Sequence, residues 1–266
     1  MNLKRKIKQL WWICYPLIEP GIEKLLPRSV KSSQNRNDRI GALYKAWGHV
    51  INSNMGGAYY EFGIYQGSSF RESFLTYQQY VGWMDSQSDS SEMWRQKIKW
   101  DFDHHFYAFD TFEGMPENLE NNEIFAKGSF LGSFENVKLE GEKIGMYEGD
   151  SIKYFKGLFS EVSKQNATNI ADLQTAAIVN IDSDLYMSAR DALEIVKPKL
   201  QQGAILMMDD WNCFRADNNQ GERRALREFL EKNSHIETEK YFSYSHVGQA
   251  FIVHTRIPPA IATPVV

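Results

Sequence analysis

The fold is decided by the stretch AAIVNIDSD, residues 176–184. The run AAIVNI, residues 176–181, has the composition of a strand that is covered on both faces, which is typical of parallel sheets. It ends in Asp182-Ser183-Asp184, so two carboxylates follow the carboxyl end of the strand. The stretch therefore predicts a buried strand whose last residues carry polar chemistry.

A second buried strand follows along the chain, AILMM at residues 204–208, and it ends in Asp209-Asp210. Between the two strands, Ser188 to Val196 have helical spacing, and Pro198 closes the helix. Strand, helix and strand in this order predict two parallel neighbours in an open α/β sheet. In such sheets ligands bind beyond the carboxyl ends of the strands, which is where the acids lie.

The rest of the chain extends this pattern. We expect further strands at 58–64 and 105–109, and a late antiparallel hairpin formed by 240–245 and 250–254. We expect helices at 42–51, 70–80, 188–196 and 222–231, and one that follows Ser151 and continues through Val162. Residues 82–104 and 114–142 are rich in polar residues and are expected to be irregular.

Composition excludes several classes of protein. The chain has 266 residues, 42% hydrophobic and 24% charged, which is typical of a globular protein and not of a disordered chain or a coiled coil. Thirty basic residues against thirty-four acidic ones leave a formal net charge of -4, so nucleic acid is not expected as a partner. Two cysteines, Cys14 and Cys213, cannot form a disulfide framework, and we expect a reducing, cytoplasmic location.

The first forty residues differ from the remainder. Lys4 to Lys8 are mostly basic, and the apolar run Leu10 to Ile18 follows them. This run is interrupted by Pro16 and is far shorter than the ~20 residues that span a bilayer, so no membrane span is expected. We expect residues 1–40 to be a helical extension and 41–266 to be the catalytic domain; a membrane-surface anchor is the alternative for the extension.

Four carboxylates, those of Asp182, Asp184, Asp209 and Asp210, close two adjacent strands. Clustered carboxylates repel each other unless some are protonated or a cation neutralises them. Oxygen ligands without a well-placed histidine favour a hard cation such as Mg²⁺. The alternative is that these acids cap the helices that follow, although capping does not require two acids at each strand end.

A glycine-containing turn follows the first predicted strand, in the sequence EFGIYQGSS at residues 61–69. Its two glycines allow a ligand to approach the backbone closely, and the missing middle glycine of the dinucleotide motif favours a smaller nucleoside. Asp110 ends the next strand, where an acid can accept the hydroxyls of a ribose. A purely structural turn and a loop or capping aspartate are the alternatives.

Together these segments resemble the macrocin O-methyltransferase family. The segments that carry the resemblance are EFGIYQGSS (61–69), FDTFEGMPE (109–117), KGSF (127–130), DSDLY (182–186) and DDW (209–211). The similarity covers about residues 41 to 254. It implies a doubly wound, Rossmann-like class I methyltransferase sheet, with S-adenosylmethionine and Mg²⁺ as cofactors and a sugar or natural-product hydroxyl as methyl acceptor.

The resemblance also implies roles for individual residues. Glu61, Gly63, Gly67 and Ser68 would surround the methionine end of the donor, and Asp110 would hold its ribose. The adenine would lie near Gly149, Asp150 and Ser151, although Asp150 stands where the family often has an aromatic residue. Asp182, Asp209 and Asp210 would bind the metal. Our own hypothesis for the mechanism is that Asp182 or another acid of the cluster accepts the proton of the acceptor hydroxyl.

Two other functions use the same residues. A metal-dependent hydrolase would use the acids to activate water, and a methyltransferase-like binding protein would hold the donor without transferring its methyl group. The sequence does not specify the acceptor beyond a small hydroxylated molecule, which we expect to be glycosidic. We also expect a homo-oligomer.

Overall fold

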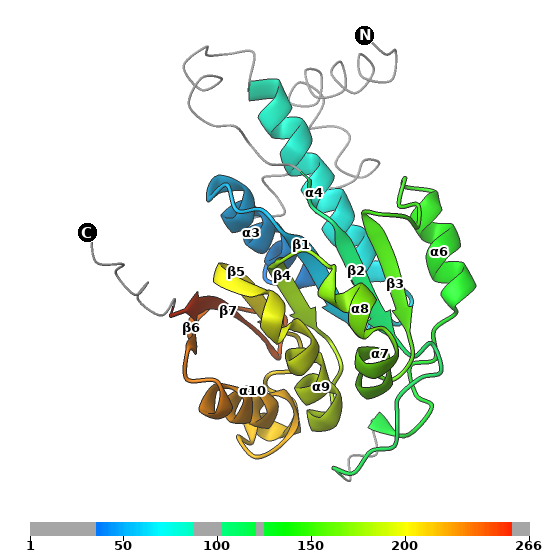
Figure 1. Cartoon of the computed structure of the whole chain (residues 1–266), viewed down its shortest axis with the longest axis vertical. Helices are drawn as coiled ribbons and strands as arrows, with labels where there is room; N and C mark the ends of the chain where they lie inside the picture. The colour runs from blue at the N-terminus through cyan, green and yellow to red at the C-terminus, as the bar shows by residue number, and fades with distance from the viewer. Residues whose placement is uncertain (1–35, 88–102, 121–124, 257–266) are drawn as a thin grey trace, which may run out of the picture.

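The computed structural model describes residues 36–87, 103–120 and 125–256, which form one mixed sheet with helices on both faces (Figure 1). The sheet has seven strands in the order β3-β2-β1-β4-β5-β7-β6. They are β1 (Ala58–Phe62), β2 (Phe106–Asp110), β3 (Ile152–Lys156), β4 (Ala176–Ile181), β5 (Leu200–Met208), β6 (Ile236–Tyr244) and β7 (Gly248–Thr255).

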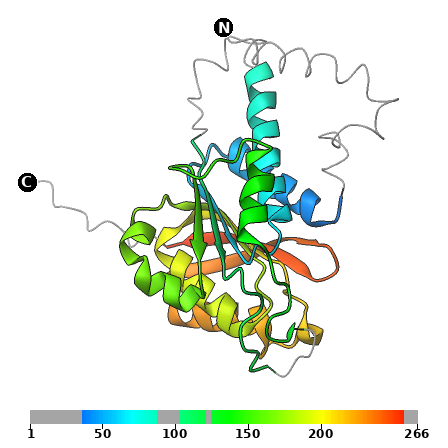
Figure 2. The same ribbon diagram turned by 90° about the vertical axis from the view of Figure 1, so that its right-hand side faces the viewer.

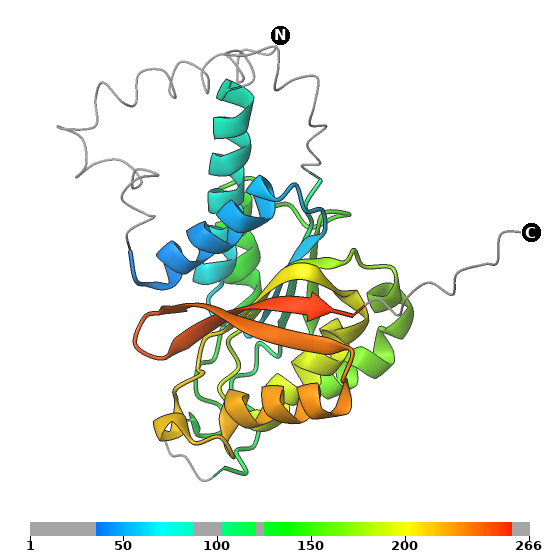
Figure 3. The same ribbon diagram turned by 90° about the vertical axis from the view of Figure 1, so that its left-hand side faces the viewer.

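The first five strands are parallel, and the last two form the predicted antiparallel hairpin. β1 pairs with β2 and β4, β2 pairs with β3, and β4 pairs with β5, all in parallel. β7 lies antiparallel to both β5 and β6, and Figure 3 shows this long hairpin in orange and red. The predicted doubly wound, Rossmann-like α/β fold is confirmed.

Two layers of helices bury the sheet (Figure 2). One face packs against α3 (Arg39–Asn52), α4 (Ser68–Gln87) and α6 (Phe134–Glu142). The other face packs against α7 (Phe159–Gln165), α8 (Ala167–Ala171), α9 (Tyr186–Val196) and α10 (Gly221–Lys232). Short 3-10 helices lie at Lys197–Lys199 and Phe214–Ala216. β4 is buried along its whole length because it lies in the middle of the sheet between both layers.

Three expectations for local structure are wrong. Residues 82–87, which were expected to be irregular, belong to α4, which continues to Gln87. Residues 152–156 form the edge strand β3, and the predicted helix begins only at Phe159. Within the expected irregular region, Ser133 caps a helix, α6, by accepting a hydrogen bond from the N–H of Asn136. Only Val137 and Gly141 of this helix are buried, so it carries little of the apolar periodicity by which a helix is recognised.

The expected division of the chain at residue 40 cuts through α3, which begins at Arg39. The body of this helix is buried through residues such as Leu43 and Trp47, and its first turn is therefore part of the packed domain. Residues 1–35 of the expected helical extension lie outside the described residues. Within the described ranges, none of the helices combines the length and apolar character that crossing a lipid bilayer requires.

Candidate active site

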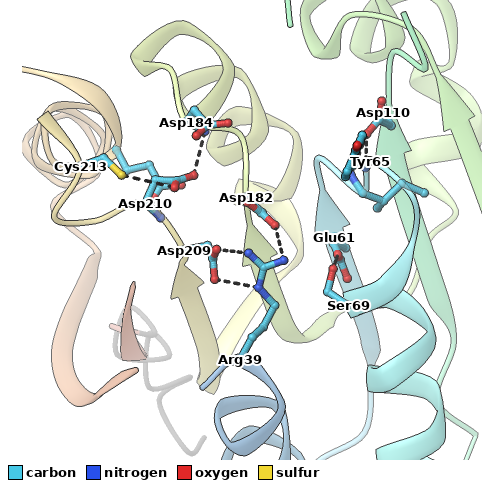
Figure 4. A network of polar contacts seen from close by, with 12 residues as sticks. Arg39, Glu61, Tyr65, Ser69, Asp110, Asp182, Asp184, Asp209, Asp210 and Cys213 are labelled. Atoms are coloured by element: carbon cyan, nitrogen blue, oxygen red, sulfur yellow. Dashed lines mark hydrogen bonds and ion pairs between the residues drawn. The ribbon is translucent and has the colours of Figure 1, made fainter. Parts of the chain in front are cut away.

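A cavity of about 450 Å³ opens at the carboxyl edge of the parallel strands. The residues that line it follow five strands in turn, and they include Gly63 after β1, Asp110 at the end of β2, Leu158 after β3, Asp182 after β4 and Asp209 after β5. The edge predicted from the sequence is therefore the edge at which the cavity lies. Figure 4 shows the polar side chains that face one another there.

Three carboxylates converge in this cavity. One oxygen each of Asp182, Asp209 and Asp210 lies within 4.8 Å of the other two. Burial raises the pKa of Asp182 well above its usual range, and the charge of Asp209 raises it further. Burial likewise raises the pKa of Asp210, with Asp184 and Asp209 adding to the effect. A compact cluster of three carboxylates with oxygen ligands alone has the chemistry of a site for a hard cation.

Asp184 lies beside this cluster without being one of its three members. Its backbone has a positive φ of 58°, and its N–H donates to Oδ2 of Asp210 over 3.1 Å. Burial raises the pKa of the Asp184 carboxyl to about 7, and the charge of Asp182 contributes. Behind the cluster, the buried Glu222 accepts a hydrogen bond from the N–H of Asp210 over 3.0 Å.

The alternative that these acids cap the following helices is wrong. The N-cap residues of α9 and α10 are Leu185 and Gln220, and neither forms a side-chain cap. A single distant carboxylate, that of Glu120, serves both helices instead. Its two oxygens accept 2.7 Å hydrogen bonds from the N–H groups of Tyr186 and Gly221. The strand-end aspartates thus remain available for the cavity.

A cation that the sequence analysis missed also lies in the cavity. Arg39, the first residue of α3, places Nη1 2.8 Å from Oδ2 of Asp182. It also makes a bidentate contact with both carboxylate oxygens of Asp209, with Nε 3.1 Å from Oδ1 (Figure 4). Burial lowers the pKa of Arg39, but the charges of Asp182 and Asp209 outweigh it, so the net shift is upward.

The glycine turn lies where the sequence predicted it, between β1 and α4. A Cβ atom on Gly63, whose φ is +84°, would lie 1.9 Å from the backbone oxygen of Asp182. A Cβ atom on Gly67 would meet Val137 at 3.0 Å. Gly63 and Ser68 line the cavity, whereas Gly67 is not among its lining residues. The turn brings β1 against the strand end that carries Asp182.

Glu61 lies beneath this turn and is completely buried. Its carboxylate accepts a hydrogen bond from the Tyr59 hydroxyl over 2.5 Å and another from the Ser69 hydroxyl. Burial raises the pKa of Glu61 to about 7, whereas these two hydroxyls and Arg39 lower it. Glu61 is therefore held beside the cavity rather than exposed within it.

Asp110 lines the cavity and also holds the turn in place. Its Oδ2 accepts hydrogen bonds from the N–H groups of Ile64, at 2.7 Å, and Tyr65, at 2.9 Å. Its Oδ1 accepts from the N–H of Phe112 at 2.7 Å. A carboxylate has about four acceptor positions, so three backbone contacts leave room for about one hydroxyl of a ligand rather than two.

The position expected for the adenine requires correction. Gly149, Asp150 and Ser151 precede β3, and the Ser151 carbonyl accepts a hydrogen bond from the N–H of Phe106 at the amino end of β2. They therefore lie at the opposite edge of the sheet and do not line the cavity. The residues that reach the cavity from β3 are Leu158 and Phe159, which follow its carboxyl end. The error follows from missing β3 in the sequence.

The outer wall of the cavity is largely apolar. Met115, Pro116, Phe125 and Phe130 line it, and all four belong to the region expected to be irregular. Phe130 packs edge to face against Tyr65, with ring centroids 6.0 Å apart. Both rings are partly exposed, so this side of the cavity presents aromatic surface to a bound molecule.

The chain is similar in sequence to known proteins. Residues 97–239 match the family model described as Macrocin-O-methyltransferase (TylF). A Streptomyces olivaceus protein, 8-demethyl-8-(2,3-dimethoxy-alpha-L-rhamnosyl)-tetracenomycin-C 4'-O-methyltransferase, is 27% identical over 113 residues. That match covers 40% of this chain and 41% of the relative, less than half of its length.

Solved structures share the fold at low sequence identity. The O-methyltransferase NovP is similar with a TM-score of 0.59 and 19% identity, over 82% of this chain and 80% of that chain. CalS11, a calicheamicin methyltransferase, is similar with a TM-score of 0.54 and 13% identity, over 95% of this chain and 93% of that chain. These similarities establish the architecture of the sheet and its helices.

Proposed function

The chain belongs to the macrocin-O-methyltransferase (TylF) family of S-adenosylmethionine-dependent O-methyltransferases, and on that premise we propose that it methylates a sugar hydroxyl with the aid of Mg²⁺. The observation that carries the proposal is the convergence of Asp182, Asp209 and Asp210 within one cavity beside the glycine turn. The proposal thus assigns to this chain the metal and the acceptor class that the family resemblance implies.

The donor fits the half of the cavity formed by β1, β2 and β3. Gly63 and Ser68 would contact its methionine end, with Glu61 and Gly67 supporting the turn from behind.

Asp110 would accept one ribose hydroxyl through its remaining acceptor position. Leu158 and Phe159 would form the apolar wall against the adenine. When bound, S-adenosylmethionine supplies a methyl group that is already electrophilic, so these residues need only bind and orient it.

The metal fits the other half of the cavity. Asp182, Asp209 and Asp210 would hold Mg²⁺, because their oxygens are of the type that this cation prefers and already lie within 4.8 Å of one another. When bound, the cation lowers the pKa of a coordinated hydroxyl and fixes its position. Asp182 is our proposed proton acceptor, since it lines the cavity at the strand end nearest the glycine turn.

The acceptor is proposed to be a sugar attached to a larger apolar molecule. The Streptomyces relative is named for the methylation of a rhamnosyl tetracenomycin, and CalS11 is named as a calicheamicin methyltransferase. The apolar wall of Met115, Pro116 and Phe125 suits the contact with such a molecule. A homo-oligomeric state and a cytoplasmic location remain predictions from the sequence.

The proposal is tested by following a labelled methyl group. We expect transfer from S-adenosylmethionine to members of a panel of glycosides when Mg²⁺ is present, and only background transfer in excess EDTA, because the acids then lack their cation. Equal transfer with EDTA would contradict the metal. Hydrolysis of phosphate esters without donor would favour the hydrolase instead, and donor binding without transfer to any acceptor would favour the binding protein.

The donor site is tested separately by Asp110→Ala. This change removes three backbone contacts that hold the glycine turn, and we expect the affinity for S-adenosylhomocysteine to fall by about tenfold or more. Isothermal titration calorimetry measures it. Asp150→Ala is the matched control, because Asp150 lies exposed at the opposite edge of the sheet, and its affinity should equal that of the wild type. If Asp150→Ala lost more affinity than Asp110→Ala, the adenine would lie near Gly149, Asp150 and Ser151, as the sequence analysis expected.

A further inference from the structure

Arg39 holds two of the three carboxylates that would bind the metal. It contacts Asp182 through Nη1 and Asp209 through Nε and Nη2, so one guanidinium bridges the ends of β4 and β5. Among the described residues that line the cavity, no other is basic. Part of the charge that offsets the acid cluster is therefore supplied by the chain itself.

The same oxygens cannot serve the guanidinium and a divalent cation equally well. Both oxygens of Asp209 and one oxygen of Asp182 are engaged by Arg39. A cation among Asp182, Asp209 and Asp210 would need oxygens from the same set and would also be repelled by the arginine charge. Binding of the metal would then require Arg39 to release at least part of these contacts.

The anchoring of Arg39 makes such a release feasible. The helix behind it is fixed, because Leu43 and Trp47 are fully buried and Asp38 caps the helix by accepting from the N–H of Gly41. The Arg39 side chain itself is 34% exposed, and it reaches the cluster from the first residue of α3. A long side chain on a fixed helix end can change rotamer without moving the fold.

We propose that Arg39 is a built-in counter-cation that competes with the divalent metal for Asp182 and Asp209. It stabilises the metal-free site by offsetting part of the negative charge of the clustered acids, and it weakens metal binding by the same interaction. The inference rests on the proposed metal site, and it adds that the first residue of α3 sets the metal affinity of that site.

The test compares the Mn²⁺ affinity of wild type and Arg39→Gln, measured by electron paramagnetic resonance of free Mn²⁺. We expect the variant to bind Mn²⁺ about tenfold more tightly or better, because a competing charge is removed. Arg39→Lys keeps the charge and should stay much closer to wild type. Arg190→Gln, which removes an arginine that pairs with Asp191 outside the cavity, should leave the affinity unchanged.

Thermal unfolding supplies a readout that does not depend on turnover. In EDTA, Arg39→Gln should melt below wild type, because the negative charge of its carboxylates is no longer partly offset. Saturating Mg²⁺ should raise its melting temperature by more than it raises that of wild type. A variant that merely folds poorly would have a lower melting temperature both in EDTA and in Mg²⁺. Mg²⁺ would then raise its melting temperature by no more than it raises that of wild type.

The outcomes distinguish failure of the metal site from failure of the competition. If wild type and Arg39→Gln both fail to bind Mn²⁺, the metal site and the competition are both wrong. If both bind it with equal affinity, the metal site stands and the competition is wrong. A crystal structure of the wild type with Mn²⁺ is independent of any variant. Arg39 should then have left at least one of Asp182 and Asp209, and an arginine that still bridges both beside the bound metal would overturn the inference.

Discussion

Asp209→Asn should lower metal-dependent methyl transfer by at least about a hundredfold in kcat/KM, since loss of an outer-shell partner of a metal ligand alone costs 10–100-fold. The substitution removes a charged oxygen from the three-carboxylate cluster and leaves an amide of nearly the same shape. It touches none of the hydrogen bonds that hold the glycine turn, which come from Asp110. Affinity for S-adenosylhomocysteine should therefore remain within about threefold of wild type, because the contacts that hold the glycine turn stay in place.

The measurement pairs steady-state transfer with Mn²⁺ binding and with calorimetric titration of S-adenosylhomocysteine. Asp184→Asn is the matched comparison, because Asp184 lies at the same sheet edge but outside the group of three. It should weaken Mn²⁺ binding far less than Asp209→Asn does. If Asp209→Asn retained both Mn²⁺ binding and methyl transfer, the proposal that Asp209 holds the metal would be wrong.

Gly63→Ala should destabilise the fold by about 3 kcal/mol or more, since it combines an unfavourable backbone conformation with a backbone clash. Gly63 has φ +84°, and a Cβ atom there would lie 1.9 Å from the backbone oxygen of Asp182. That oxygen belongs to the main chain and cannot rotate away, so β1 and β4 would have to separate at the edge that forms the cavity. Urea unfolding, read by circular dichroism, measures the loss.

Gly128→Ala isolates the clash from the backbone conformation. Gly128 has nearly the same φ, +82°, and nothing lies within 4 Å of the Cβ position. It should cost only about 1 kcal/mol, the strain of a non-glycine residue at positive φ. Equal losses for the two variants would mean that the contact between β1 and the Asp182 backbone relaxes at little cost.

The central strands were predictable because burial on both faces demands an apolar run. Residues 176–181 and 204–208 have such runs, and both lie in the middle of the sheet. β3 was not predictable in the same way, because an edge strand is only partly covered. Its burial is confined to Ile152 and Phe155, a spacing of three that equally suits one face of a helix. The displaced adenine assignment followed from this ambiguity.

The acid cluster was predictable because parallel strands place their ends at a common edge, whatever intervenes along the chain. Its counter-charge was not. Arg39 lies 170 residues before Asp209, and no local pattern links a helix-starting arginine to a distant carboxylate. Glu120 was missed for the same reason, since helix N-termini are ordinarily capped by a residue adjacent in sequence.

Glu120 connects the proposed acceptor wall to the helices that follow the acid-bearing strands. It lies four residues after Pro116 of the apolar wall, and its carboxylate grips the starts of α9 and α10, which follow the two acid-bearing strands. Neither Met115 nor Pro116 makes these contacts to the helix starts, whereas a substitution at Glu120 would remove the hydrogen bonds at the first turns of both α9 and α10. Directed evolution of the acceptor range should therefore keep Glu120 and randomise positions 115 and 116.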